Sequence, residues 1–317
     1  MSAKKTAKAR IPLLPKQPNE WRIETSTRIA NEILGFPAYV AELNRLLSNT
    51  PVDLKQVGEV IRTEPNLSSH ILHLCKLTMP CFGDQIASIE HGVVSLGIDQ
   101  MRTLILACCL VRDLGNCYSA DQLRSFWQHS VLTASLSERI ARYMNYPRAE
   151  NAYRAGLFHD AGALALVRWA ARTRTANELG NSLCGEMIEA ERDTLGIDHC
   201  FVGNLIGQAW GLPAEIVDVL KCHHYPLEAQ CDRVLVGMVA AADSFCVERG
   251  IRFQLVKEPA SESARALFPQ SLSQWLPDLG SDLDKKLRDV LEMTYLQKVN
   301  DFDSGYGSVF GRPLVRT

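Results

Sequence analysis

The most constraining feature of this chain is an apolar run, AGLFHDAGAL at residues 155–164, in which a histidine and an aspartate stand side by side. Burying His159 and Asp160 is costly unless each finds a partner, because polar and charged groups lose their hydration inside a protein. A fold that buries this run must therefore bring hydrogen-bond partners or a metal ion to the pair.

A second carboxylate and several imidazoles pose the same problem elsewhere in the chain. Asp243 is the only ionisable group in the apolar run VGMVAAADSF (236–245), and five of the eight histidines lie between residues 129 and 224. We expect these groups to meet in one cluster. The candidate metal ligands are His129, His159, Asp160, His199, His223, His224 and Asp243.

The spacing of apolar residues indicates an all-α fold. Helical periodicity is clear in VDLKQVGEVIRTEP (52–65) and FWQHSVLTASLSERIARYMN (126–145), and no segment alternates with the period of two that marks strands. Two helices are expected to meet at Gly97, whereas residues 149–171 are expected to form one helix that includes the His-Asp pair. Further helices are expected at 26–35, 182–196, 198–211, 213–224 and 281–302.

Composition limits the classes of partner and compartment. The net charge of the 317-residue chain is −2, which gives no electrostatic reason to expect nucleic acid or an anionic membrane as partner. The longest strongly apolar run, LILACCLV at 104–111, is too short to span a bilayer, and no secretory signal follows the basic start. The ten cysteines include no C-x-x-C pair and are expected to be reduced thiols, so we expect a cytoplasmic protein.

Imidazoles and carboxylates in one cluster suit one or two divalent ions of Fe, Mn, Zn or Ni, and no other cofactor is expected. Two ions bridged by a carboxylate would activate water and hold a phosphoryl oxygen, which makes Asp160 the candidate catalytic residue. A hydrogen-bonded network without metal is the alternative. On that alternative His199 is a first-turn residue beside an Asp198 cap, and His223 and His224 cap the carbonyls of the preceding helix.

The order of these residues carries a resemblance to known families. His129, the pair at 159–160 and Asp243 resemble the His…His-Asp…Asp pattern of the HD phosphohydrolase superfamily. His199 and the pair at 223–224 resemble the expanded two-metal form of HD-GYP phosphodiesterases. The run from about 25 to 250, with EVIRTEPNLSSHILHLCK, AGLFHDAGAL and KCHHYP, is most similar to the HDOD family of bacterial signalling modules.

Two departures from the enzymes bear on function. Ala163 stands where HD enzymes carry the lysine of HDIGK that helps to hold phosphate, and HHYPLEAQCDR lacks the E…DGxGYP segment of HD-GYP proteins. The ligand set is present while the phosphate-binding set is absent. Since HDOD proteins are generally treated as regulators without catalysis, the resemblance implies a signalling module that binds a protein partner or a nucleotide.

We therefore predict a two-lobed all-α HDOD regulator with an optional metal in its second lobe. The predicted divisions are a basic tail at 1–20, an HDOD domain at 21–250 with lobes at 21–117 and 118–250, and a C-terminal extension at 251–317 with one amphipathic helix. The alternative is a metal-dependent phosphohydrolase acting on a nucleotide or cyclic dinucleotide. The sequence indicates no oligomeric state.

Overall fold

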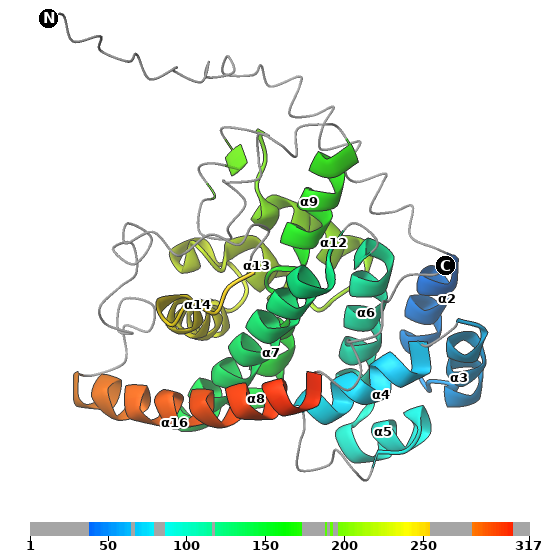
Figure 1. Ribbon diagram of the computed structural model, residues 1–317, viewed down its shortest axis with the longest axis horizontal. Helices are drawn as coiled ribbons and strands as arrows, with labels where there is room; N and C mark the ends of the chain where they lie inside the picture. The colour runs from blue at the N-terminus through cyan, green and yellow to red at the C-terminus, as the bar shows by residue number, and fades with distance from the viewer. Residues whose placement is uncertain are drawn as a thin grey trace, which may run out of the picture.

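The computed structural model describes residues 38–64, 67–78, 86–115, 118–172, 188, 191–192, 196–253 and 281–306. Within these ranges the secondary structure is entirely helical, which confirms the predicted all-α class (Figure 1). The predicted helix at 26–35 and the basic tail lie outside the described residues, and the predicted helix at 182–196 lies largely outside them. None of the described helices is both long enough and apolar enough to cross a bilayer.

In the described part of the chain, the N-terminal lobe has five helices, of which α2, α4 and α5 pack on α6. They are α2 (Ala38–Leu47), α3 (Leu54–Thr63), α4 (Leu67–Thr78), α5 (Ile89–Leu96) and α6 (Ile98–Gly115). Asp53 begins α3 by accepting hydrogen bonds from the backbone N–H groups of Lys55 and Gln56. Gly97 ends α5 with a φ of 83°, a conformation that favours glycine, and the predicted break between α5 and α6 is confirmed.

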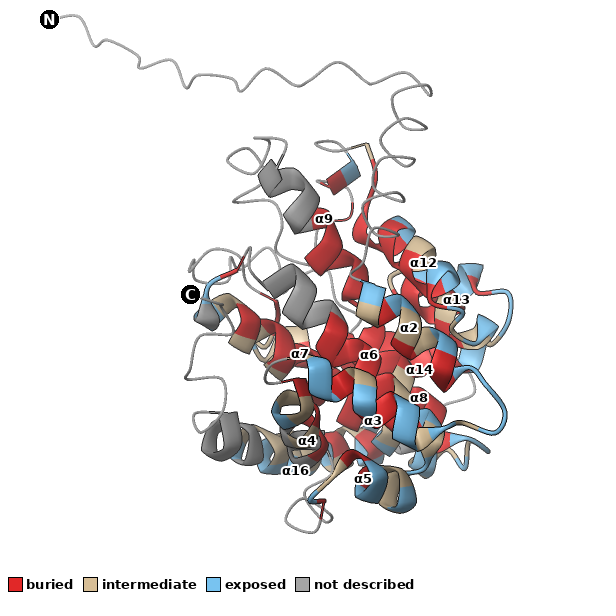
Figure 2. Cartoon of the chain, turned by 90° about the vertical axis from the view of Figure 1, so that its right-hand side faces the viewer, coloured by how far each residue is buried: buried red, intermediate tan, exposed pale blue. Residues whose placement is uncertain are grey.

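The second lobe is built around a long central helix, α7 (Ala120–Tyr143), whose first turn is closed by a capping box between Ser119 and Gln122. The other members are α8 (Ala149–Phe158), α9 (Ala161–Arg172), α12 (His199–Ala209), α13 (Ala214–Cys222), the 3₁₀ turn η1 (Pro226–Glu228) and α14 (Arg233–Glu248). Helices α8 and α14 pack on α7, while α12 lies between α9 and α13. Figure 2 shows that buried residues concentrate on α6, α7, α8 and α14.

The single helix expected over 149–171 is wrong, because the chain breaks at the His-Asp pair. Helix α8 ends at Phe158, His159 and Asp160 form a turn, and α9 begins at Ala161. A Cβ atom at Gly162 would lie only 2.0 Å from the carbonyl oxygen of His199 and 2.5 Å from the backbone nitrogen of Gly203. The change of direction at the pair therefore allows α9 to cross α12 at nearly backbone contact.

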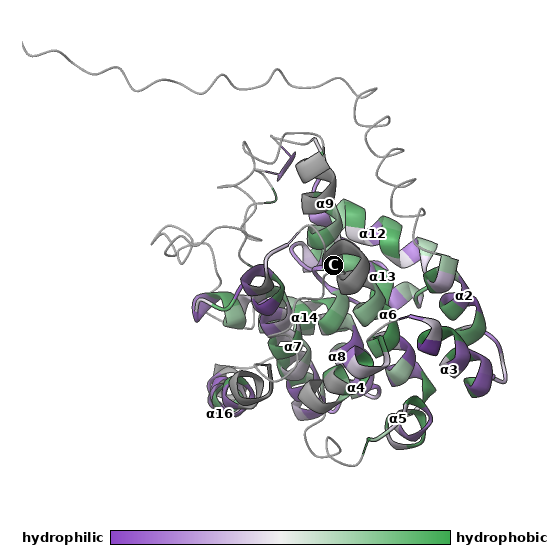
Figure 3. Ribbon diagram, turned by 45° about the vertical axis from the view of Figure 1, so that its right-hand side comes forward, coloured by the Kyte–Doolittle hydropathy of each residue, from purple (hydrophilic) through white to green (hydrophobic). Residues whose placement is uncertain are grey.

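The C-terminal helix α16 (Ser281–Tyr306) lies along one edge of the molecule, against α7 and α4 (Figure 1). It buries Leu287 and Leu291, and the Arg249 guanidinium pairs with Glu292 on it. Colouring by hydropathy shows hydrophilic faces on α16 and α3 and a largely hydrophobic α14 (Figure 3). The helix thus presents its apolar stripe to the second lobe.

Candidate metal centre

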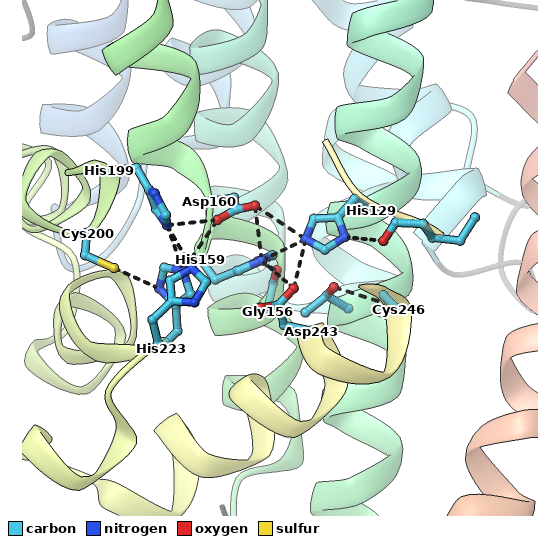
Figure 4. A network of polar contacts seen from close by, with 12 residues as sticks. His129, Gly156, His159, Asp160, His199, Cys200, His223, Asp243 and Cys246 are labelled. Atoms are coloured by element: carbon cyan, nitrogen blue, oxygen red, sulfur yellow. Dashed lines mark hydrogen bonds and ion pairs between the residues drawn. The ribbon is translucent and has the colours of Figure 1, made fainter. Parts of the chain in front are cut away.

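All seven sequence-predicted ligands come together in the second lobe. His129 comes from the middle of α7, His159 and Asp160 from the turn between α8 and α9, and Asp243 from α14. His199 begins α12, and His223 and His224 directly follow α13. Figure 4 shows Asp160 between His129 on one side and His199 with His223 on the other.

The two carboxylate oxygens of Asp160 face two different groups of imidazoles. Its Oδ2 atom is 3.4 Å from His129 Nε2 and 3.5 Å from His159 Nε2. Its Oδ1 atom is 3.4 Å from His223 Nε2 and 3.7 Å from His199 Nε2. Asp160 therefore connects two ligand groups, as a bridging carboxylate does in a two-metal site.

The first ligand group is completed by Asp243. Its Oδ1 atom is 3.2 Å from His129 Nε2 and 3.8 Å from His159 Nε2, and these two nitrogens are 3.1 Å apart. The group offers two imidazole nitrogens and two carboxylate oxygens from α7, the α8–α9 turn and α14. This mixture of donors suits a first-row transition metal.

The second ligand group consists of three histidines beside Asp160. His199 Nε2 is 3.3 Å from His223 Nε2 and 3.0 Å from His224 Nε2. The sequence left open whether His223 caps a carbonyl or binds metal, and its ring is placed for both. Its Nδ1 atom lies 3.0 Å from the Val219 carbonyl oxygen, while its Nε2 atom faces Asp160.

In four of the histidines, the Nδ1 atom points away from the centre and forms a hydrogen bond to an oxygen that can only accept. The Nδ1 atoms of His129, His159 and His223 donate to the carbonyl oxygens of Ile251, Gly156 and Val219 at 3.1, 2.7 and 3.0 Å. His199 Nδ1 donates to Glu191 Oε2 at 2.7 Å. Each ring therefore turns its Nε2 atom inward, and that atom can bind either a proton or a metal ion; this is the orientation of a metal-ligating histidine.

The spacing of the inward atoms fits a metal ion. Two lone pairs that face each other at 3.0–3.3 Å, as between His199 and its neighbours, are stabilised only by a proton or a cation between them. Ligand atoms about 2.0–2.1 Å from one ion lie about 2.9–3.4 Å from each other in tetrahedral or octahedral geometry. The donor set suits one ion in each group, and the separations of 3.0–3.4 Å lie in this range, whereas those of His159 from Asp160 and Asp243 and of His199 from Asp160, at 3.5–3.8 Å, are longer.

Burial and charge act in opposite directions on these groups. Burial disfavours the charged form of an imidazole, but Asp160 and Asp243 outweigh it at His129 and raise its pKa to about 10. The pKa of His223 is likewise raised to about 10 against burial, by Cys200 and Asp160. Burial dominates at His159 and lowers its pKa to about 4.

The carboxylates stay ionised despite their burial. Burial would raise the pKa of Asp243, yet its hydrogen bond to His129 and the neighbouring imidazoles lower it to about 2. The imidazoles around Asp160 likewise hold its pKa well below the ordinary value. The centre therefore attracts positive charge, carried either by protons on its histidines or by metal ions.

Two residues of the centre were missed by the sequence analysis. Glu191 is buried and accepts hydrogen bonds from both the backbone nitrogen and Nδ1 of His199, so it orients that ring. Cys200 Sγ lies 3.8 Å from His223 Nδ1, and its pKa is lowered because the charges of His223 and His199 outweigh burial. The position of Glu191 eight residues before His199 could not have identified it, since the sequence does not show that its carboxylate meets the ring at the start of α12.

The predicted Asp198 cap is confirmed. The Asp198 carboxylate accepts a hydrogen bond from the backbone nitrogen of Phe201 at 2.7 Å and pairs with Arg192 at 2.5 Å. His199, however, is fully buried, so its alternative interpretation as a surface residue of the first turn is wrong. Cys222 beside the histidine pair contacts Asp218 instead of the centre.

A family model for the HDOD domain matches residues 33–226 of the chain. The chain belongs to the HDOD family. This HDOD protein shares its fold with a solved HDOD domain protein of unknown function from Geobacter sulfurreducens, at 24% identity and a TM-score of 0.58, over 89% of this chain and 99% of that one. A Shewanella amazonensis SB2B structure, named provisionally as a phosphohydrolase, has 23% identity and a TM-score of 0.60 over 89% of this chain and 97% of its own.

A curated relative from Treponema pallidum (strain Nichols), whose function is uncharacterised, is 22% identical over 249 residues. The alignment covers 75% of the HDOD protein but only 46% of that relative, so the chain spans less than half of the relative's length. These similarities establish the two-lobed HDOD fold.

Proposed function

We propose that this HDOD protein is a signalling module whose second lobe binds two divalent metal ions and which acts by binding a partner, without turnover. The observation that supports the metal centre most strongly is the position of Asp160, whose two oxygens face two separate groups of inward-turned imidazoles. A polar network kept only for packing does not require every Nε2 atom to face a common interior.

The first ion would be held by His129, His159, Asp160 and Asp243. The second would be held by Asp160, His199, His223 and His224. A bound ion supplies a Lewis acid and a fixed positive charge at this point. The residues of the chain orient that charge, since Glu191 and the three backbone carbonyls fix the imidazole rings.

Two observations support a binding role over turnover. Position 163, where HD enzymes carry a phosphate-holding lysine, is a buried alanine whose backbone nitrogen bonds to the Asp160 carbonyl. The seven candidate ligands come from helix α7, the α8–α9 turn, helix α12, the segment after α13 and helix α14, and six of them are buried. Binding of metal at the centre would therefore fix the relative positions of these elements and shape the surface that they present to a partner.

The metal content of the purified protein tests the centre directly. We expect two equivalents of metal per chain in the wild type, after preparation without an affinity metal or after reconstitution with Mn, Fe, Zn or Ni. Asp160→Asn removes the bridging charge with little change of shape and should reduce the content to less than one equivalent. His199→Ala should retain one equivalent, held by the first group.

His91→Ala is the matched control, because His91 is an exposed histidine on α5 of the N-terminal lobe. It should leave the metal content unchanged. A metal content that is zero in the reconstituted wild type, or equal in wild type and Asp160→Asn, would overturn the proposal. A hydrogen-bonded network without metal would then be the correct interpretation.

Phosphohydrolase activity is the second candidate function, because Asp160 occupies the bridging position that a two-metal hydrolase requires. Turnover of bis(p-nitrophenyl) phosphate and of a cyclic dinucleotide should be measured with Mn or Fe in the wild type and in Ala163→Lys. A hydrolase should turn over in the wild type and gain about 10²–10³-fold when the electrostatic stabiliser is restored. Absence of turnover in both proteins, with metal bound, supports the binding role.

The partner that we propose is a cytoplasmic protein of a signalling pathway. If metal loading shapes the binding surface, a partner recovered by affinity capture with the metal-loaded wild type should be retained at least several-fold less by Asp160→Asn. Equal retention of the partner by both proteins would separate partner binding from the metal centre.

A further inference from the structure

A small cleft lies between the two lobes, and it shares no lining residue with the candidate metal ligands. Its walls come from α6, from α8 and from the segment that leads into α13. Two arginines line it, Arg102 from the N-terminal lobe and Arg154 from the second lobe. The cleft therefore brings two guanidinium groups from separate lobes to one place.

The hydrogen-bonding capacity of both arginines is incompletely used. The Nε atoms of Arg102 and Arg154 are buried and have no hydrogen-bond partner among the described residues. Arg102 Nη2 donates only long bonds, at 3.2 Å to Asn44 Oδ1 and at 3.4 Å to the carbonyl oxygens of Trp210 and Gly211. A buried guanidinium donor without an acceptor is unfavourable, so an anion in the cleft would satisfy it.

The carboxylate nearest to this pair is a weak partner. Asp99 Oδ2 is 3.4 Å from Arg154 Nη1, and the Asp99 side chain is 74% exposed. Such a pair is screened by water and contributes little. Burial lowers the pKa of Arg102, and the pKa stays below its ordinary value although Asp99 raises it, since the like charge of Arg154 lowers it further. Asp99 therefore does not balance the positive charge of the cleft.

Two helix N-termini add to this positive character. Asp99, Arg102 and Thr103 lie in the first two turns of α6, and Pro213 is the N-cap of α13. No side chain caps the first backbone N–H groups of α13. The N-terminal end of a helix carries a partial positive charge and favours anions.

The remaining wall of the cleft is apolar and includes Leu106, Phe158 and Ile216, all of them buried. We propose that the cleft binds a small organic anion, with a phosphate or carboxylate group on Arg102 and Arg154 and a flat apolar body against Phe158 and Leu106.

The ligand would connect the cleft to the rest of the molecule. Arg102 already joins the lobes through the Trp210 and Gly211 carbonyls, and Phe158 directly precedes His159 of the candidate metal centre. Occupancy of the cleft would therefore change the contacts between the lobes next to that centre. The binding itself does not depend on the proposed function.

Calorimetric titration of the full chain with AMP, in the presence of EDTA, tests the site without any contribution from a metal-bound phosphate. Adenosine, inorganic phosphate and benzoate separate the contributions of the ring, the phosphate and a carboxylate head. AMP or benzoate should bind, adenosine should bind at least 10-fold more weakly than AMP, and added NaCl should weaken the anions. If neither AMP nor benzoate binds, or if AMP binds only without EDTA, the proposal is overturned.

Variants then place the ligand in the cleft. Arg154→Met should weaken binding by about 10- to 100-fold, the usual effect of removing a hydrogen bond to a charged group. Asp99→Asn should tighten binding by about 2- to 5-fold, because it releases Arg154, and a misfolded variant would not produce such a gain. Arg142→Met is the matched control, since Arg142 is an exposed arginine paired with Glu138 on α7, outside the cleft. Equal affinities in wild type, Arg154→Met and Asp99→Asn would overturn the proposal.

Discussion

The N-terminal lobe and the second lobe differ in what they bury. Around α6 the interior is formed by aliphatic side chains such as Leu43, Ile61, Ile71 and Ile105, each fully buried. The second lobe has an equally apolar interior but encloses the candidate centre, with its five imidazoles and the carboxylates of Asp160 and Asp243. Packing alone stabilises the first lobe, whereas the second also needs positive charge at its centre, supplied by protons or metal.

Of the changes considered, metal removal should have the largest effect on stability, and it should act through the second lobe. Wild-type protein with each metal ion at 1,000 times its dissociation constant should lose about 4 kcal/mol of stability per ion on chelation, seen as a lower Tm by scanning calorimetry. Asp160→Ala should melt at the same temperature with and without EDTA, and at a lower temperature than the metal-loaded wild type, because it loses the shared ligand and leaves neighbouring charges unpaired. An equal response of both proteins to EDTA would contradict the contrast between the lobes.

Truncating the interior of the N-terminal lobe should destabilise it without affecting the centre. Ile105→Ala removes a fully buried side chain of α6 and should cost about 2–5 kcal/mol in urea unfolding, since a cavity remains. Its metal content should equal that of the wild type. Val94→Ala, at a position that is 83% exposed on α5, should change stability by less than about 0.5 kcal/mol.

Removing the charge on Glu191 should have a smaller effect, a loss of affinity for metal in the second lobe. Glu191→Gln weakens the acceptor that fixes His199 Nδ1, and the affinity for metal should fall by about 10- to 100-fold. Competition with a chromogenic chelator measures this affinity. Glu215→Gln, at a carboxylate that pairs with Arg148 away from the centre, should leave the affinity unchanged.

The smallest expected effect concerns a helix cap in the N-terminal lobe. Asp53→Ala removes the acceptor for the first N–H groups of α3 and should cost about 1 kcal/mol in urea unfolding. Asp53→Asn should retain most of that stability, because an amide oxygen can still accept. A loss of metal in either Asp53 variant would show that the stability of the N-terminal lobe affects metal binding in the second lobe, which would contradict the contrast between the two lobes.

Much of the fold could be predicted because it depends on local patterns. Phe126, His129, Thr133, Leu136 and Ile140 share one helical stripe in the sequence, and all five are buried on α7. The break at Gly97 followed from the conformational freedom of glycine at a helix end. Such signals lie within a few residues of the feature that they determine.

The features that the sequence analysis missed or predicted wrongly depend on contacts between different segments of the chain. The break at His159 and Asp160 goes with the close crossing of α9 and α12 at Gly162, where backbone atoms of His199 occupy the space of a Cβ. The role of Glu191 similarly depends on a hydrogen bond to a ring that belongs to another element. Neither contact has a signature in the local spacing of residues. The seven candidate ligands were found because burying them demanded partners, wherever those partners came from.

The hydrogen bonds at the Nδ1 atoms bear on how the ligands of such a centre can be replaced during evolution. His159 and His223 are each held by a carbonyl of their own local segment, Gly156 and Val219, so neither depends on a neighbouring ligand for its orientation. Replacing one ligand would leave these two rings in position. The centre can therefore lose its ligands one at a time, passing through forms with partial occupancy, while the helices that surround it stay folded.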